Sequence, residues 1–263
     1  MLMKVNFVSF GTENCEELLE RFYAGLLQSC REDFILHYYS INYESKVAGE
    51  RLVSRKIETR RKYEWGVYYK PLALIRSLID LDSSDFIYLD LDILLTKKFS
   101  SVELFSKIED SETPLSPNHF WENPFFFAGE NTTPMGESIA EMKSIQRCCP
   151  YVQNCLIVYQ KRHLDFLLDW MSLIHDGEVS KIMCGDEEVY NVSLWGYGQT
   201  KTLGYICVTN GTVDVDGLGR FGSIERSYEK FEAGEFDRDM FTDRNNFYSR
   251  FDTEKAMIFH GIK

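Results

Sequence analysis

The segment Phe86-Ile87-Tyr88-Leu89-Asp90-Leu91-Asp92 places two aspartates directly after a run of apolar residues. Its aromatic and β-branched members, and the Ile93-Leu94-Leu95 that follows, are typical of a buried strand. Because residues i and i+2 of a strand point to the same side, we expect Asp90 and Asp92 to leave the sheet together. Two converging carboxylates need a cation between them, and such oxygens suit Mg²⁺ or Mn²⁺. The segment therefore predicts a metal-dependent enzyme that acts on a phosphate-bearing substrate.

Composition narrows the possible partners. The 263 residues, 44% of them hydrophobic, are enough for a substantial core. The net charge of −12 argues against nucleic acid and anionic membranes as main partners. One basic cluster stands out against this charge, formed by Arg51, Arg55, Lys56, Arg60, Arg61 and Lys62. Such a cluster is most often a solvated face, and the alternative is that it covers donor phosphates or attracts an anionic acceptor.

No feature of the sequence indicates export, a disulfide framework or a membrane span. The seven cysteines include no Cys-x-x-Cys pair, so neither zinc nor a disulfide framework is indicated. Residues 1–10 are too short and too alternating for a signal peptide, and no apolar run approaches the about 18 residues of a spanning helix. We expect a cytoplasmic protein without stable membrane insertion.

Strand and helix patterns alternate along the first part of the chain. Strands are predicted at 4–10, 34–41 and 86–92, with helices at 16–29 and 71–82 between them. This alternation predicts a mostly parallel sheet flanked by helices, an α/β fold, in which ligands collect at the carboxyl ends of the strands. Further strands are expected at 152–160, 205–209 and 256–259, and helices at 163–175 and 186–195. We expect a single domain over residues 1–263.

Four segments occur in an order that matches a known family. They are Tyr69-Lys70-Pro71, Leu89-Asp90-Leu91-Asp92, the stretch from Gly185 to Asn191 (GDEEVYN) and His260-Gly261-Ile262-Lys263. Together they resemble the GT-A-fold retaining glycosyltransferases of the glycogenin and bacterial galactosyltransferase type. The resemblance implies transfer of a sugar, with retention, from a nucleotide-sugar donor, usually a UDP-sugar, to a glycan or protein acceptor. It also divides the domain into a nucleotide-binding part, about 1–100, and an acceptor and sugar part, about 101–263.

The resemblance implies a bound Mn²⁺, or Mg²⁺, with three protein ligands. Asp90 and Asp92 would ligate the metal, Asp90 would also contact the ribose, and His260 would complete the set. An imidazole among carboxylates is chemically reasonable for Mn²⁺.

Other residues are implied to contact the donor. The end of the first strand, including Phe10, Gly11 and Thr12, would line the pocket for the uracil and ribose. Lys70 and Lys263 would neutralise diphosphate oxygens. In this chain Lys263 follows His260 after only two residues, which is closer than in the family pattern.

Asp186 and Glu187 are the predicted catalytic residues. Asp186 matches the aspartate of the family's Gly-Asp-Gln motif and would hold the transferred sugar; alternatively, it could simply cap the helix that follows. Glu187 replaces the family's glutamine and adds a charge near the sugar. The family's Asn-Ser-Gly strand motif is represented here by Gln153-Asn154-Cys155.

Two other classes of protein remain possible at this stage. Haloacid-dehalogenase-like phosphatases also carry Asp-x-Asp after an apolar strand, but usually at the start of the fold, whereas 85 residues precede this segment. A non-catalytic glycan-binding protein with the same fold is the second alternative. Retention of both aspartates and His260 argues against it, because a scaffold needs no metal ligands.

Overall fold

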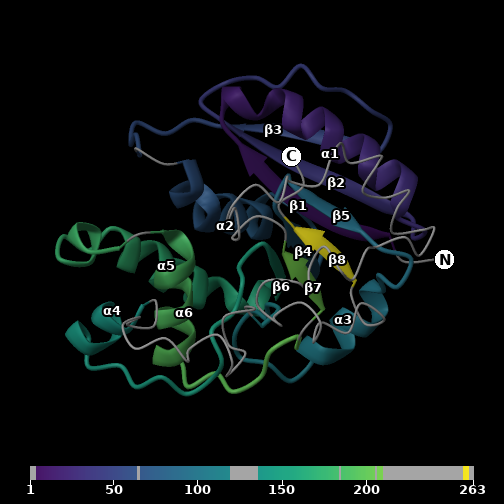
Figure 1. Cartoon of the computed structure of the whole chain (residues 1–263). Helices are drawn as coiled ribbons and strands as arrows, with labels where there is room; N and C mark the ends of the chain where they lie inside the picture. Colours follow the sequence, from purple (N-terminus) through teal and green to yellow (C-terminus); the bar gives the residue numbers. More distant parts are fainter. Residues whose placement is uncertain are drawn as a thin grey trace, which may run out of the picture.

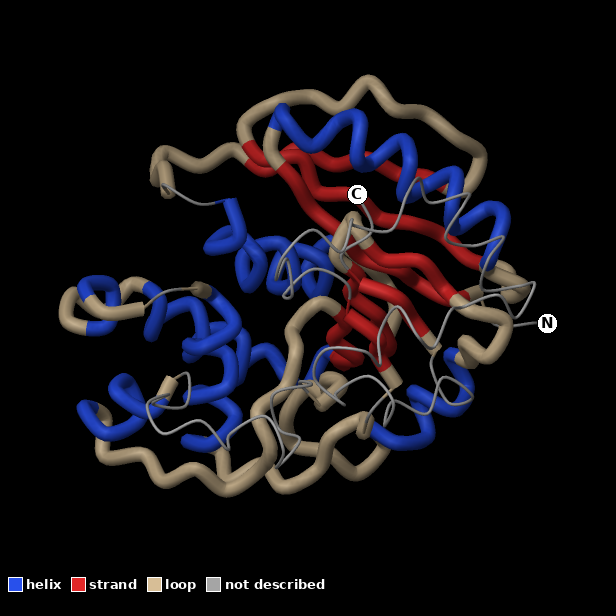
Figure 2. Tube along the Cα trace, viewed as in Figure 1, coloured by secondary structure: helices blue, strands red, loops and turns tan. Residues whose placement is uncertain are grey.

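The computed structural model describes residues 4–63, 66–118, 136–183, 185–204, 206–209 and 257–260. A five-stranded sheet in the order β3-β2-β1-β4-β6 lies between two layers of helices (Figures 1 and 2). The strands of this sheet are β1 (Val5–Gly11), β2 (Phe34–Ile41), β3 (Leu52–Ile57), β4 (Asp85–Leu89) and β6 (Leu156–Gln160). The mixed α/β architecture predicted from the sequence is confirmed.

The first four strands of this sheet are parallel, and the last is not. β1 pairs in parallel with β2 and β4, and β2 pairs in parallel with β3. β6 runs antiparallel to β4, with Leu89 opposite Leu156. Parallel strands end at the same edge of a sheet, so the residues after β1, β2, β3 and β4 are neighbours there.

Six α-helices and four 3₁₀-helices are present among the described residues. The α-helices are α1 (Glu16–Ser29), α2 (Lys70–Asp80), α3 (Ser101–Ile108), α4 (Glu137–Met142), α5 (Leu164–Ile174) and α6 (Asp186–Gly196). The 3₁₀-helices are η1 (Glu13–Cys15), η2 (Gly66–Tyr69), η4 (Lys161–His163) and η5 (Val179–Lys181). None of the described helices is long and apolar enough to cross a bilayer.

Apolar stripes place the helices on opposite faces of the sheet. In α1, Leu19, Phe22 and Leu26 are spaced for one helical face and pack in one core with α3 and the small sheet described next. α2, which begins with Lys70-Pro71 as proline preference favours, joins α4, α5 and α6 in the other core.

A second, three-stranded sheet brings the end of the chain to the first. It has the order β5-β8-β7, with β5 (Ile93–Leu95), β8 (Ile258–His260) and β7 (Cys207–Thr209). β8 pairs antiparallel with β5, with His260 opposite Ile93. Figure 1 shows β8, in yellow, beside the end of β4 although more than half of the chain separates them in sequence.

Two predicted strands have clearly different bounds, and one strand was not predicted. β4 ends at Leu89, so Asp90 and Asp92 lie in the turn between β4 and β5 and do not share one strand face. The strand expected from residue 152 begins at Leu156. β3 was not anticipated because only Leu52 and Ile57, its first and last residues, are buried, which leaves no apolar alternation to detect.

Candidate functional site

Asp90, Asp92 and His260 converge at the carboxyl end of β4. His260 Nε2 lies 3.4 Å from Asp92 Oδ1 and 3.8 Å from Asp90 Oδ2. One candidate ligand atom from each residue lies within 4.8 Å of the others. Backbone pairing brings the three side chains together. The Asp90 N–H donates to the Cys155 carbonyl at 2.9 Å, and the β5–β8 register places His260 opposite Ile93, the residue after Asp92.

The charges of this triad are strongly coupled. The pKa of Asp90 is raised, because burial outweighs the attraction of Lys70. The pKa of Asp92 is lowered, since His260 more than offsets burial. The pKa of His260 is raised to about 10, because Cys155 and the carboxylates of Asp92 and Asp90 outweigh burial. The carboxylates therefore favour positive charge between them.

The donor set of the triad fits a small divalent cation. Two carboxylates and one imidazole are ligands that Mn²⁺ accepts. The three candidate ligand atoms lie within 4.8 Å of one another, with two of the separations at 3.4 Å and 3.8 Å, so one small ion would contact all three after side-chain adjustment. The side chains keep 22–24% of their surface exposed, which leaves room for further ligands from a substrate.

Lys70 is the buried centre of a second cluster, next to the triad. Its Nζ lies 3.2 Å from Asp90 Oδ1 and 3.3 Å from Asp186 Oδ2, and it donates to Asn154 Oδ1 at 3.0 Å. Nζ also stands 5.2 Å from the centroid of the Tyr88 ring. The pKa of Lys70 is raised despite burial, because Asp186 and Asp90 surround the ammonium. An ammonium has three hydrogens, and these acceptors satisfy all of them.

Asp186 begins α6 and is held in place by two other segments. Asn154, which lies just before β6, donates its Nδ2–H to Asp186 Oδ2 at 2.6 Å. The indole of Trp170 donates to the Asp186 carbonyl at 3.3 Å. The N-cap residue is Gly185, and no side chain caps this helix, so the capping alternative for Asp186 is wrong. The carboxylate is committed to Lys70 and Asn154 instead.

Glu187 is half-buried on the same first turn of α6. Its Oε2 accepts the Asn154 N–H at 3.3 Å. Burial and the neighbouring Asp186 raise its pKa to about 7, while Lys70 pulls in the opposite direction. Glu187 is therefore a carboxyl group that exchanges a proton near neutral pH, beside the buried carboxylate of Asp186.

The end of β1 packs against the neighbouring strands. Phe10 is buried and its ring stacks on Tyr88 with centroids 6.1 Å apart. Gly11 has no space for a Cβ, which would collide with the Tyr38 hydroxyl and with Cys15. Thr12 is half-buried and donates to Asn14 Oδ1 at 2.8 Å. Of these three, Thr12 is the residue left open to a ligand.

The structure thus brings together most of the predicted site. Asp90, Asp92, His260, Lys70 and Asp186 form one connected group, with Glu187 at its margin, whereas Lys263 lies outside the described residues. Asn154 was not among the predicted site residues, although it touches Lys70, Asp186 and Glu187. The sequence did offer one signal for Asn154, because it lies in Gln153-Asn154-Cys155, the segment that corresponds to the family's Asn-Ser-Gly motif.

Comparison with known proteins identifies the fold. No protein-family model and no curated protein sequence matches the chain. Among solved structures, the bifunctional glycosyltransferase WbbM matches 98% of this chain with a TM-score of 0.58 and 14% identity. The chain spans 45% of WbbM. The galactosyltransferase LgtC, in complex with donor and acceptor sugar analogues, matches 97% of this chain and 86% of its own, with a TM-score of 0.56 and 10% identity.

An active-site mutant of LgtC matches with the same TM-score, identity and coverage. The fold of the chain is therefore the GT-A fold of these glycosyltransferases. At these identities the likeness concerns the fold, and the chemistry has to be argued from the site.

Proposed function

We propose that this protein is a metal-dependent glycosyltransferase that moves a sugar, with retention, from a UDP-sugar to a glycan or a protein side chain. The observation that carries the proposal is the Asp90–Asp92–His260 triad joined through Asp90 to the buried Lys70–Asp186 pair. The triad lies at the carboxyl ends of parallel strands, which is where an α/β sheet usually binds its ligands. The shared fold of WbbM and LgtC supports the same reaction class.

In this proposal Asp90, Asp92 and His260 hold Mn²⁺, or Mg²⁺. The ion, when bound, supplies positive charge for the diphosphate that leaves the sugar. Residues about 1–100 form the nucleotide side of the site, in which Thr12 at the end of β1 is open to the nucleoside. Residues about 101–263 form the side of the transferred sugar and of the acceptor's reacting end.

Lys70 has a positioning role in this proposal. The resemblance assigns it to the diphosphate, but Asp90, Asp186 and Asn154 already accept from its ammonium. A direct bond to a phosphate would require one of these buried acceptors to lose its partner, which is unfavourable. Lys70 therefore holds the metal-binding carboxylate and the sugar-side carboxylate in one rigid unit.

Asp186 and Glu187 serve the reacting sugar. Asp186, fixed by Lys70 and Asn154, holds the sugar through its hydroxyls and places negative charge near an anomeric carbon that gains positive charge. Glu187, with a pKa of about 7, accepts or donates a proton beside it at neutral pH.

Calorimetric titration of UDP with and without Mn²⁺ tests the proposal. Wild type should bind UDP only with Mn²⁺, and Asp92→Asn should weaken that binding at least about 100-fold, because it removes a charged metal ligand. Asp82→Asn is the matched control, since Asp82 is an exposed aspartate before the same strand, and it should bind as wild type does.

A donor panel then reads out the transfer itself. Slow release of UDP from one UDP-sugar, lost in Asp92→Asn, would support catalysis, and NMR of the glycosylated product would report the anomeric configuration. UDP binding that is independent of Mn²⁺, or unaffected by Asp92→Asn, would refute the proposed metal site. Metal-dependent binding without turnover of any donor would favour the non-catalytic glycan-binding alternative.

A further inference from the structure

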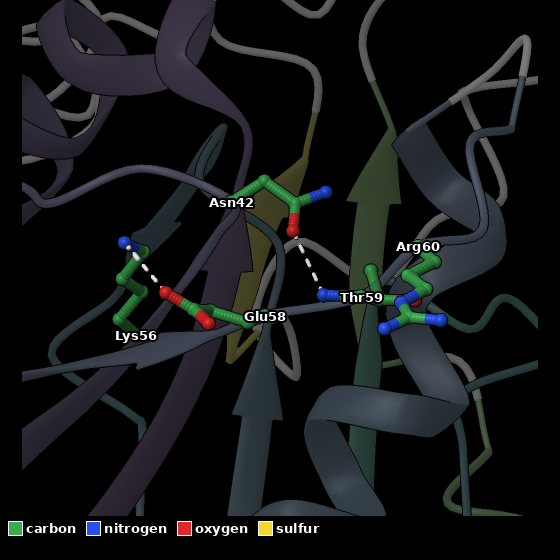
Figure 3. A pocket seen from close by; sticks show the side chains of 5 residues that line it. All are labelled: Asn42, Lys56, Glu58, Thr59 and Arg60. Carbon is green, nitrogen blue, oxygen red and sulfur yellow. Dashed lines mark hydrogen bonds and ion pairs between the residues drawn. The ribbon is translucent and has the colours of Figure 1, made fainter.

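A pocket of about 410 Å³ lies away from the triad, where β2 and β3 end. It is lined by Asn42, Lys56, Glu58, Thr59 and Arg60 (Figure 3). β2 and β3 end at the same edge of the sheet as β4. β3 is three strands from β4, and neighbouring strands are about 4.8 Å apart, so the end of β3 is roughly 14 Å from the end of β4 across the sheet.

The backbone around this pocket is tied together. The Asn42 N–H donates to the Ile57 carbonyl at 2.9 Å, and the Thr59 N–H donates to Asn42 Oδ1 at 2.8 Å. Asn42 has φ of 61°, a left-handed conformation that asparagine tolerates better than most residues. The Asn42 side-chain oxygen therefore links the ends of β2 and β3 by accepting from Thr59. Its NH₂ group can donate to a ligand.

The pocket has an excess of donors and positive charge. Residues 55–62 carry five basic residues and one acidic residue, in a chain whose net charge is −12. Three of the basic groups are engaged: Lys56 pairs with Glu58 at 3.0 Å, Arg55 contacts His37 at 3.1 Å, and Arg61 stands 5.5 Å from the Tyr63 ring.

Among the described residues, Arg60 and Lys62 have no such contact, and of these two Arg60 lines the pocket. Within the part of the chain that the structure describes, its guanidinium has no hydrogen-bond or ion-pair partner. Figure 3 shows it on the pocket wall, apart from the Lys56–Glu58 pair. A guanidinium presents five N–H donors in a fork that matches the two oxygens of a carboxylate or phosphate. The Glu58 carboxylate and the Asn42 amide beside it suit sugar hydroxyls.

We propose that this pocket binds an acidic sugar residue, bearing a carboxylate or a phosphate, in a part of the acceptor glycan away from its reacting end. This inference rests on the proposed glycosyltransferase function. The reacting end must lie beside Asp186, which shares Lys70 with Asp90 at the end of β4, whereas the pocket lies where β2 and β3 end, on the opposite side of β1. A second contact with the same glycan raises the affinity of that glycan, because binding at one place increases its effective concentration at the other. The pocket itself takes no part in transfer.

The polar lining favours a soluble saccharide over a membrane surface. A bilayer would meet a flat face with apolar side chains among its basic residues, and the residues lining this pocket are polar or charged. Salt should weaken the binding, because the lining charges are exposed and screened.

Amide-shift NMR titration in the presence of saturating UDP and Mg²⁺ tests the inference. The probes are glucuronic acid, glucose 6-phosphate and glucose, and the proteins are wild type, Arg60→Gln and Arg31→Gln. Arg31→Gln is the matched control, since Arg31 is an exposed arginine before β2, at the opposite edge of the sheet. Thermal unfolding checks that all three proteins are folded.

We expect at least one acidic sugar to shift the amides of residues 56–60 and to bind at least about tenfold more tightly than glucose. Arg60→Gln should weaken that binding about tenfold, the loss of one charge-assisted contact, and Arg31→Gln should not change it. Comparing the two acidic probes tells whether the carboxylate or the phosphate is the preferred group.

Three results would overturn the inference. They are equal effects of Arg60→Gln and Arg31→Gln, equal binding of glucose and both acidic sugars, and Arg60-dependent binding to vesicles of phosphatidylglycerol and phosphatidylcholine without binding of the soluble sugars. The UDP titration of wild type and Asp92→Asn separates these failures from failure of the proposed function. Metal-dependent UDP binding with no acidic-sugar binding refutes this pocket alone.

Discussion

The Lys70 cluster and the Lys56–Glu58 pocket place oppositely charged side chains at the same edge of one sheet, but in different surroundings. Lys70 is 2% exposed and touches two carboxylates, whereas Lys56 and Glu58 are exposed to water. Water solvates the second pair whether or not it forms, so the pair contributes little to stability. Burial makes the first set of charges depend on one another. The same kind of pair is thus a structural requirement in one place and a surface contact in the other.

The net charge of the two regions also differs in sign. Among the described residues, the Lys70 cluster and the adjacent triad combine Asp90, Asp92, Asp186 and Glu187 with Lys70 and His260 as their cationic partners, which suits an added cation. The pocket leaves the Arg60 guanidinium unpaired within the described residues, which suits an added anion. The four predictions that follow test this contrast.

Replacing the buried lysine should have the largest effect. Lys70→Met leaves the buried Asp186 and the partly buried Asp90 without their shared cation, and we expect the free energy of unfolding to fall by about 3 kcal/mol. Urea unfolding measures the change. Lys56→Met, which removes the exposed counterpart, should leave the unfolding midpoint unchanged within error. Equal stability of Lys70→Met and wild type would remove the contrast between the two regions.

Adding Mn²⁺ should stabilise the buried region and not the pocket. At Mn²⁺ about 100 times the dissociation constant, wild type should gain about 2.7 kcal/mol, seen as a higher Tm. His260→Ala lacks one ligand and should lose most of this gain, whereas Glu58→Gln removes an exposed carboxylate and should retain it. A Tm rise of the same size in His260→Ala would place the ion elsewhere.

Glu187 should make stability depend on pH. Because its folded-state pKa is about 7 against an ordinary value of 4.5, the native state holds a proton that the unfolded state loses between these pH values. Stability from this group is therefore greatest below pH 4.5 and falls as pH rises toward 7. Glu187→Gln cannot ionise, so its Tm relative to wild type should increase from pH 5 to pH 8. A constant difference over that range would refute the shifted pKa.

The smallest effect is expected inside the pocket. Lys56→Gln should weaken acidic-sugar binding by no more than about twofold, because Glu58 already neutralises much of the Lys56 charge, whereas Arg60→Gln should weaken it about tenfold. The same NMR titration measures both variants. If Lys56→Gln had the larger effect, the anion would sit on the ammonium and the assignment to Arg60 would be wrong.

Local sequence was a good guide wherever a segment carried its own pattern. The spacing of Leu19, Phe22 and Leu26 predicted α1, and Pro71 marked the start of α2. β3 carries no such pattern and was missed. Asp90 and Asp92 were predicted to lie together on one strand face. They do lie close together, but in the turn after Leu89, where β8 brings His260 beside them.

The sequence by itself determined the α/β alternation and the presence of carboxylates after a buried strand, because period and composition are local properties of the chain. Only the tertiary structure decided that Lys70, Asp90, Asn154 and Asp186 form one buried cluster and that His260 reaches Asp92. These residues come from α2, the β4–β5 turn, the segment before β6, the start of α6 and β8. Their partnership follows from strand register and helix packing, and no local pattern encodes either.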